Sequence, residues 1–102
     1  MNIIPKFPFR GQGYTISITV SGKVQGVFFR QSTKEIATNL GITGQVKNLP
    51  DGSVYILATG TKDQLDKLLA WCRQGPPKAT VITIDTKELS YQLFDKFLIL
   101  RH

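Results

Sequence analysis

The chain has 102 residues, of which 41% are hydrophobic and 20% charged, and 13 Lys and Arg against 7 Asp and Glu give a net charge of +6. This size allows one domain with a single core, and the composition excludes a fibrous or disordered protein. No apolar run approaches the roughly 18 residues of a membrane span, so we expect no membrane partner. One cysteine, Cys72, excludes an internal disulfide and cannot alone build a metal site.

The first thirteen residues, MNIIPKFPFRGQG, are interrupted by Pro5 and Pro8. They lack the continuous apolar region and the small-residue cleavage site of a signal peptide. We therefore expect a flexible tail over residues 1–13, a single domain over residues 14–102 and a cytoplasmic location.

The first regular element is a strand from Tyr14 to Val20, where polar and apolar residues alternate. The alternation predicts a core-facing set, Ile16, Ile18 and Val20, and an outward-facing set, Thr15, Ser17 and Thr19. From Phe29 the period becomes helical, and the expected buried stripe comprises Phe29, Thr33, Ile36, Ala37 and Leu40. Gly41 then ends this helix as a C-cap.

The next segments predict a β-hairpin, in which strands 42–48 and 53–59 flank the turn sequence Leu49-Pro50-Asp51-Gly52. A second helix is expected from about Thr61 to Arg73, where Gly75-Pro76-Pro77 stops it. Its buried stripe comprises Leu65, Leu68, Leu69 and Cys72. Strands at residues 79–86 and 97–100 follow, separated by a polar connection around residues 88–92.

The resulting order is β-α-β-β-α-β plus a short terminal strand, and both helices are amphipathic. This order suits an α+β ferredoxin-like sandwich, in which two helices pack on one face of an antiparallel sheet. The fold alone decides nothing about chemistry, because many unrelated functions use it.

A glycine-containing turn joins the first strand to the first helix, with the sequence Gly22-Lys23-Val24-Gln25-Gly26-Val27-Phe28-Phe29-Arg30. Glycine lets backbone N–H groups approach an anion closely, and a helix N-terminus adds unpaired donors. Arg30 in the first helical turn can donate two hydrogen bonds to phosphate oxygens. The turn therefore predicts a phosphate site, where inorganic phosphate or sulfate should act as an inhibitor.

The strong catalytic groups are missing from the sequence. His102 is the single histidine, and no paired carboxylates, activated Ser or Cys, or Walker-type motif occurs. An enzyme of this composition needs an activated substrate. Acyl phosphates qualify, because their leaving group is a carboxylate whose conjugate acid has a pKa of about 4. Phosphoryl transfer then depends chiefly on holding the phosphate and neutralising its charge.

The segment from Gly22 to Arg30 resembles the phosphate-loop motif of the acylphosphatase family, glycine-x-valine-glutamine-glycine-valine-x-phenylalanine-arginine. The family's second motif is similar to residues 44–48, Gly-Gln-Val-Lys-Asn, followed by residues 51–54, Asp-Gly-Ser-Val, and by Gly60. The resemblance covers roughly residues 14–101. The sequence departs from the family pattern at Gln45, where many relatives carry an aromatic residue, and at His102, where a terminal tyrosine is common.

The resemblance implies hydrolysis of acyl phosphates, with no metal and no cofactor. It implies that Arg30 binds the substrate phosphate and that Asn48 orients the attacking water, while the phosphate itself accepts the proton of the water. Backbone amides of the loop would hold the remaining phosphate oxygens. The implied substrate-binding residues are Val24, Gln25, Gly26, Val27, Phe28, Phe29 and Arg30.

The alternative is a non-catalytic ferredoxin-like module that binds an anion or RNA, because RNA-recognition domains share this fold. Their aromatic residues lie on central strands, whereas Phe28 and Phe29 lead into a helix, and the first strand presents only Thr15, Ser17 and Thr19. We therefore expect an acylphosphatase without a nucleic-acid partner, acting as a monomer on a small acyl phosphate.

Overall fold

A computed structural model describes residues 13–101, so the expected tail lies almost wholly outside the described residues, as does His102. The chain forms seven elements: β1 (Tyr14–Lys23), α1 (Phe29–Leu40), β2 (Thr43–Asn48), β3 (Val54–Gly60), α2 (Lys62–Gln74), β4 (Thr80–Leu89) and β5 (Phe97–Leu100). In the described part of the chain, no helix has the length and apolarity needed to cross a membrane.

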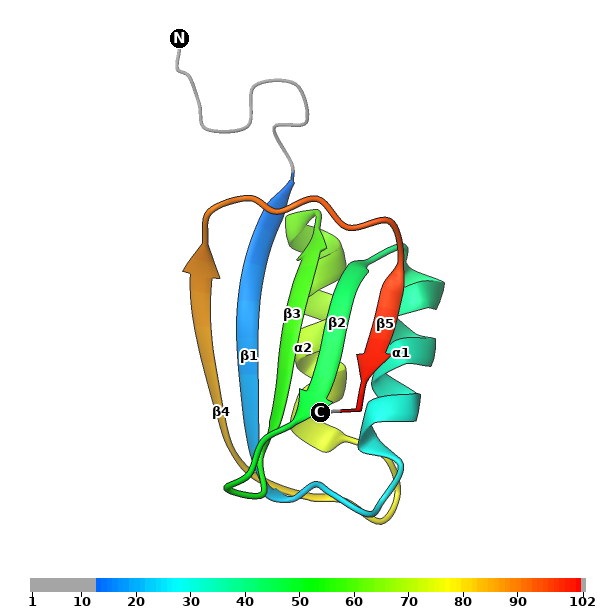
Figure 1. The fold of residues 1–102 in the computed structure, drawn as a ribbon, viewed down its shortest axis with the longest axis vertical. Helices are drawn as coiled ribbons and strands as arrows, with labels where there is room; N and C mark the ends of the chain where they lie inside the picture. Colours follow the sequence, from blue (N-terminus) through cyan, green and yellow to red (C-terminus); the bar gives the residue numbers. More distant parts are fainter. Residues whose placement is uncertain (1–12, 102) are drawn as a thin grey trace, which may run out of the picture.

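The sheet confirms the expected ferredoxin-like order, including its short terminal strand. The strand order is β4-β1-β3-β2-β5, and both helices cover one face (Figure 1). The first four strands in sequence pair antiparallel, as expected, whereas β5 runs parallel to β2 and makes the complete sheet mixed. As a result β1, β2 and β5 all end at the same edge of the sheet.

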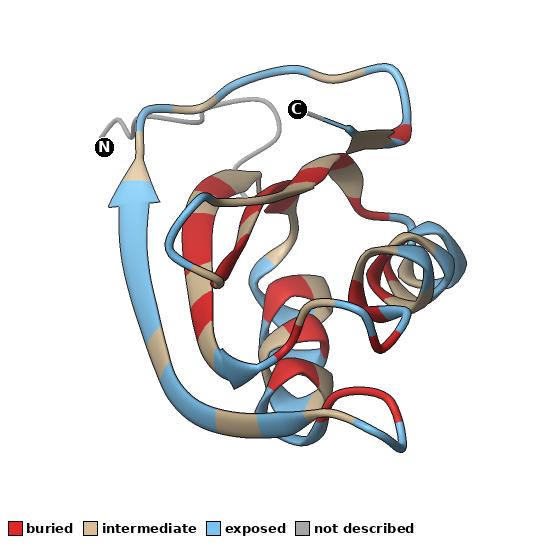
Figure 2. Cartoon of the chain, turned by 60° about the horizontal axis from the view of Figure 1, so that its bottom comes forward, coloured by how far each residue is buried: buried red, intermediate tan, exposed pale blue. Residues whose placement is uncertain are grey.

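The core fills the space between the sheet and the two helices (Figure 2). The strands contribute mainly aliphatic side chains, Ile18, Val20, Val46, Val54, Ile56 and Ala58. Both helical stripes predicted from the sequence face this core: Phe29, Thr33 and Ala37 of α1 and Leu65, Leu68 and Cys72 of α2 are buried. Burial also raises the pKa of the Cys72 thiol to about 12, so this cysteine is a packing residue.

The helix ends follow local chemistry. Gly41 ends α1 in the left-handed conformation, and its N–H bonds to the carbonyls near the helix end, as the sequence predicts. Thr61 and Gln64 form a reciprocal capping box at the start of α2.

The outward face of β1 differs from the expectation. Thr15 and Ser17 are buried, although the alternation predicted that they would face solvent. The Gln92 N–H donates to Thr15 Oγ1 at 2.8 Å, and the Thr59 hydroxyl donates to the Gln92 carbonyl at 2.8 Å. The connection from β4 to β5 therefore crosses this face and covers its upper end (Figure 1).

The expected polar connection around residues 88–92 was also placed too early. β4 continues to Leu89, because its last residues pair with the start of β1, where Thr15 lies opposite Leu89. A long antiparallel partner extends the strand beyond the point at which its β-branched composition ends.

Gly44 provides a test of the sheet packing. It has φ 144°, and a Cβ there would overlap the carbonyl oxygen of Leu57 on the neighbouring strand. Gly44→Ala should therefore reduce the free energy of unfolding by about 3 kcal/mol or more, through backbone strain and overpacking. Gly52→Ala is the matched control, because Gly52 also has positive φ, at 95°, but no atom lies within 4 Å of the place that a Cβ would take there. Urea unfolding of both variants measures the difference, and equal losses would contradict this account.

Candidate active site

The loop between β1 and α1 reverses the chain through two left-handed residues. Gly26 has φ 74° and Phe28 has φ 64°, while Val24 and Val27 anchor the loop by packing their side chains in the core. Phe28 serves as the N-cap of α1 without any side-chain capping bond. With this path, the loop and the N-terminus of α1 line the same pocket.

The start of α1 supplies unpaired amide donors. The first hydrogen bond of this helix runs from the Ser32 N–H to the Phe28 carbonyl at 3.0 Å. The amides of Phe29, Arg30 and Gln31 precede it and have no acceptor within the helix. Their N–H groups and the helix dipole together favour an anion at this position.

Gln25 ties the loop to the hairpin turn. Its side-chain NH2 group donates to the carbonyls of Leu49 and Ser53, each at 2.9 Å. Those two carbonyls lie on either side of the turn that joins β2 to β3. The side chain thereby holds the loop between β1 and α1 against the end of β2, where Asn48 lies.

The turn has its own internal support. The Asp51 carboxylate accepts the Ser53 N–H at 3.0 Å and the Ser53 hydroxyl at 2.6 Å. These bonds favour the charged carboxylate and lower the pKa of Asp51 below its usual value of 3.8. The Gly52 N–H also donates to the Leu49 carbonyl at 3.1 Å, which confirms the predicted turn.

Arg30 lies in the first turn of α1, where a cation opposes the helix dipole. Its guanidinium donates a long hydrogen bond of 3.5 Å to the Leu100 carbonyl at the end of β5. Within the described residues, the ion pairs join Lys62 to Asp66 and Lys67 to Asp63 on α2, so neither neutralises Arg30. An anion placed beside Arg30 would offset the unfavourable dipole.

Asn48 ends β2 and faces the same space. Among the described residues, its Oδ1 is the buried side-chain oxygen or nitrogen that lacks a hydrogen-bond partner. Such a group costs about 1–3 kcal/mol if nothing satisfies it. Rotation about the last side-chain torsion can present either end of the amide to a molecule that enters the pocket.

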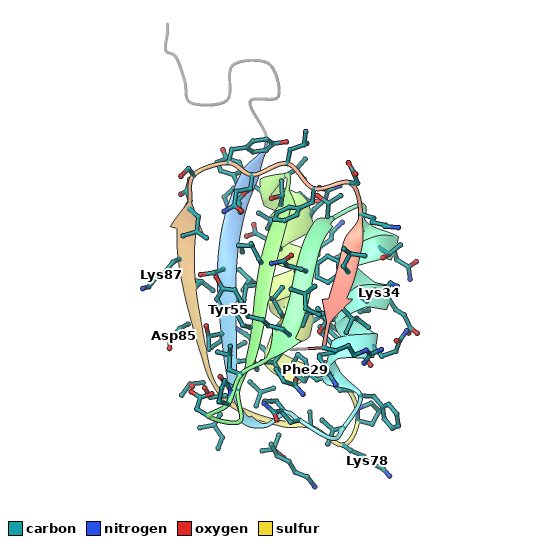
Figure 3. All side chains as sticks on the ribbon, viewed as in Figure 1. Phe29, Lys34, Tyr55, Lys78, Asp85 and Lys87 are labelled. Atoms are coloured by element: carbon teal, nitrogen blue, oxygen red, sulfur yellow. The ribbon has the colours of Figure 1, made fainter. Side chains whose placement is uncertain are left out.

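One pocket of about 470 Å³ collects these groups. It is lined by Val24, Gln25, Gly26, Phe28, Phe29, Arg30, Gln31, Asn48, Ile99 and Arg101. Figure 3 labels one of the lining residues, Phe29, which lies at the lower end of the sheet close to the start of α1. The loop, the end of β2 and the end of β5 thus meet at one edge.

The sequence predicted most of this lining but missed three residues. Gln31, Ile99 and Arg101 were not predicted, and two of these lie at the end of β5. Only the parallel pairing of β5 with β2 brings them to Asn48, and the sequence carries no signal for that pairing. Arg101 adds a second cation to the wall beside Arg30.

Three sequence positions lie away from the pocket. The Val27 side chain belongs to the core, although its amide remains in the loop. Gln45 lies within β2 opposite Leu57 and Leu98 and does not line the pocket. Gly22 lies in β1, where a Cβ would overlap the Thr80 carbonyl, so its role is close packing of strands rather than approach to an anion.

Residues 13–101 contain no group of three or more His, Cys, Asp or Glu side chains that could hold a metal ion. The polar groups that line the pocket are instead amides and guanidinium groups. Such groups donate hydrogen bonds, and they match an anionic ligand.

Comparison with known proteins places the same segments in one family. A family model described as acylphosphatase matches residues 16–99. An acylphosphatase of Methylococcus capsulatus is 46% identical over 87 residues, which cover 84% of this chain and 95% of the relative. One of Acaryochloris marina is 49% identical and covers 84% and 92% of the two chains. The structure of an acylphosphatase from Coxiella burnetii matches with a TM-score of 0.86 and 40% identity, over 89% of this chain and 96% of the other.

The Gln25 contacts generate a prediction. Gln25→Ala removes two hydrogen bonds between the loop and the turn, so it should lower the free energy of unfolding by about 1–3 kcal/mol. It should also weaken binding of inorganic phosphate, because the loop loses its anchor. Calorimetric titration with phosphate and urea unfolding measure the two effects. Gln74→Ala, at an exposed position at the end of α2, serves as the control. Unchanged phosphate affinity in the Gln25 variant would refute the anchoring role.

Proposed function

Because the chain belongs to the acylphosphatase family and hydrolyses acyl phosphates, we propose that Arg30 and Asn48 carry this reaction in the pocket described above. The observation that supports the proposal most directly is the unpaired Asn48 oxygen at the pocket that also holds Arg30. Among the described residues, the Asn48 oxygen has no hydrogen-bond partner and Arg30 has no paired carboxylate, so the two groups complement a water molecule and a phosphate, respectively.

The phosphate group of the substrate binds at the N-terminus of α1. Amides of the loop and of the first helical turn donate to its oxygens, and Arg30 adds a charged donor with a forked geometry. The bond from Arg30 to the Leu100 carbonyl holds the guanidinium at this end of the pocket. Preorganised donors of this kind stabilise the charge that develops on a transferring phosphoryl group.

Asn48 positions the water that attacks phosphorus. As the bond from the water oxygen to phosphorus forms, the bond from phosphorus to the acyl oxygen breaks and a carboxylate leaves. The carboxylate is a good leaving group and needs no protein acid. A phosphate oxygen accepts the proton of the water, so the products are a carboxylate and inorganic phosphate.

A non-catalytic anion-binding or RNA-binding module remains the less favoured function. Phe29 is buried and packs against Trp71, with ring centroids 5.3 Å apart, so it is unavailable to stack on a base. Thr15 and Ser17 on the outer face of β1 are buried as well. These observations support our proposal that nucleic acid is not a partner. The expected monomeric state and cytoplasmic location stay predictions.

Arg30→Ala should lower kcat/KM by about 10² to 10³, because one preorganised charged donor is removed. Arg30→Lys should fail as well, since an ammonium group cannot reproduce the forked contact. Steady-state hydrolysis of acetyl phosphate measures the effect, and Arg73→Ala at the exposed end of α2 is the control. If either Arg30 variant kept activity within a few-fold of the parent protein, the assignment would be wrong.

Asn48→Ala should reduce kcat on the order of 10²-fold through misplacement of the water. Phosphate binding should change little, because an interaction made mainly in the transition state leaves ground-state affinity intact. The melting temperature should not fall, since the side-chain oxygen forms no hydrogen bond with the described residues that the variant could lose. Asn39→Ala on the exposed side of α1 is the matched control. A variant with normal kcat and a lower melting temperature would make Asn48 a structural residue.

Inorganic phosphate and sulfate should inhibit competitively and stabilise the folded protein. At ten times its dissociation constant, phosphate adds about 1.4 kcal/mol of stability, which raises the melting temperature by several degrees. A thermal scan with chloride at the same ionic strength is the reference. The shift should be much smaller in Arg30→Ala, and an equal shift in both proteins would place the anion elsewhere.

A further inference from the structure

Phe28 breaks two local rules at once. It adopts a left-handed conformation that a bulky residue rarely takes, and it caps α1, where Ser, Thr, Asp, Asn or Gly is preferred. Burial of the ring does not compensate, because Phe28 is 78% exposed. An aromatic side chain that costs stability and gains no packing is better explained by a contact with a ligand.

The neighbouring residue provides the contrast. Phe29 is 2% exposed and packs against Trp71, so the core already holds one phenylalanine from this loop. Within residues 13–101 the other exposed large hydrophobic residues are Ile82, Leu93 and Leu98, and none of them lines the pocket. Phe28 does line it, on the loop that leads into the anion-binding end of α1.

The pocket is also larger than a phosphate site requires. Its volume of about 470 Å³ lies in the range of roughly 300–1,000 Å³ that holds whole small molecules. Arg30 and the helix amides account for the anionic end. Phe28 and Ile99 supply an apolar part of the lining, which is available to the acyl group of the substrate.

Building on the proposed function, we propose that Phe28 is a specificity-determining residue that contacts the acyl group and favours acyl phosphates with an aromatic acyl group. An aromatic ring at the mouth of the pocket can pair edge-to-face or offset-stacked with the ring of such a substrate. Acetyl phosphate has only a methyl group in that place and gains little from the ring. The loop thus binds the phosphate with its backbone and selects the acyl group with one side chain.

The test compares benzoyl phosphate with acetyl phosphate through the ratio of their kcat/KM values. Phe28→Asn removes the ring while keeping a residue that tolerates the left-handed conformation and caps helices well, so the variant should fold. Phe28→Tyr keeps the ring. Leu93→Asn removes an equally exposed apolar side chain away from the pocket and is the matched control.

The benzoyl-to-acetyl ratio should fall about 3- to 10-fold in Phe28→Asn, the size expected for one aromatic contact. The ratio should stay unchanged in Phe28→Tyr and in Leu93→Asn. An unchanged or higher ratio in Phe28→Asn would overturn the specificity role, even if both activities fell together, because a common loss reports only on loop geometry. If the parent protein hydrolyses both compounds and the ratio is the same in Phe28→Asn, the specificity role is wrong but the proposed function stands. A parent protein that hydrolyses neither would defeat both proposals.

Discussion

The two hydrogen bonds of the Gln25 side chain are the constraint on which the arrangement of the site depends. Arg30 comes to the pocket on α1 and Asn48 comes on β2, so their relative placement rests on how the loop meets the hairpin turn. Gln25 joins these two segments directly through the Leu49 and Ser53 carbonyls. The turn itself is stiffened by Asp51, which accepts two hydrogen bonds from Ser53. A binding site needs this kind of support, because small misplacements of its groups cost large factors in rate.

Most residues that stabilise the fold lie away from the pocket, although Val24 and Phe29 belong to both the core and the pocket lining. Away from the pocket the local rules are obeyed: Thr61 and Gln64 cap α2, and Gly41 ends α1 in the conformation that suits glycine. At the pocket they are broken, since Phe28 is left-handed and the buried Asn48 oxygen has no hydrogen-bond partner within residues 13–101. Each departure lowers the stability of the fold, and the packing of the core compensates for this loss. Departures concentrated at one edge of the sheet are what a functional site produces.

Periodicity predicted the helices, the hairpin and the ferredoxin-like order, because each depends on residues close together in sequence. Gly41 and Gly75 marked the helix ends for the same reason. The burial of Thr15 was missed, since it results from a connection about seventy-seven residues away along the chain. Arg101 was missed too, because its place follows from a parallel strand pairing that no local pattern encodes. The residues that the loop contributes to the pocket could thus be predicted, whereas the pocket walls built by distant segments could not.

The position of β5 has a consequence for the order in which the molecule is made. This strand is the last element of the domain to leave the ribosome, yet it brings Ile99 and Arg101 to the pocket and offers Arg30 the Leu100 carbonyl. The pairing of β1 with β3 involves none of these residues, whereas Ile99 also packs against the core beside α1. A chain that stops before β5 still contains most of the buried core residues, but one wall of the pocket is missing. The pocket is therefore completed only when the last strand of the domain pairs with β2.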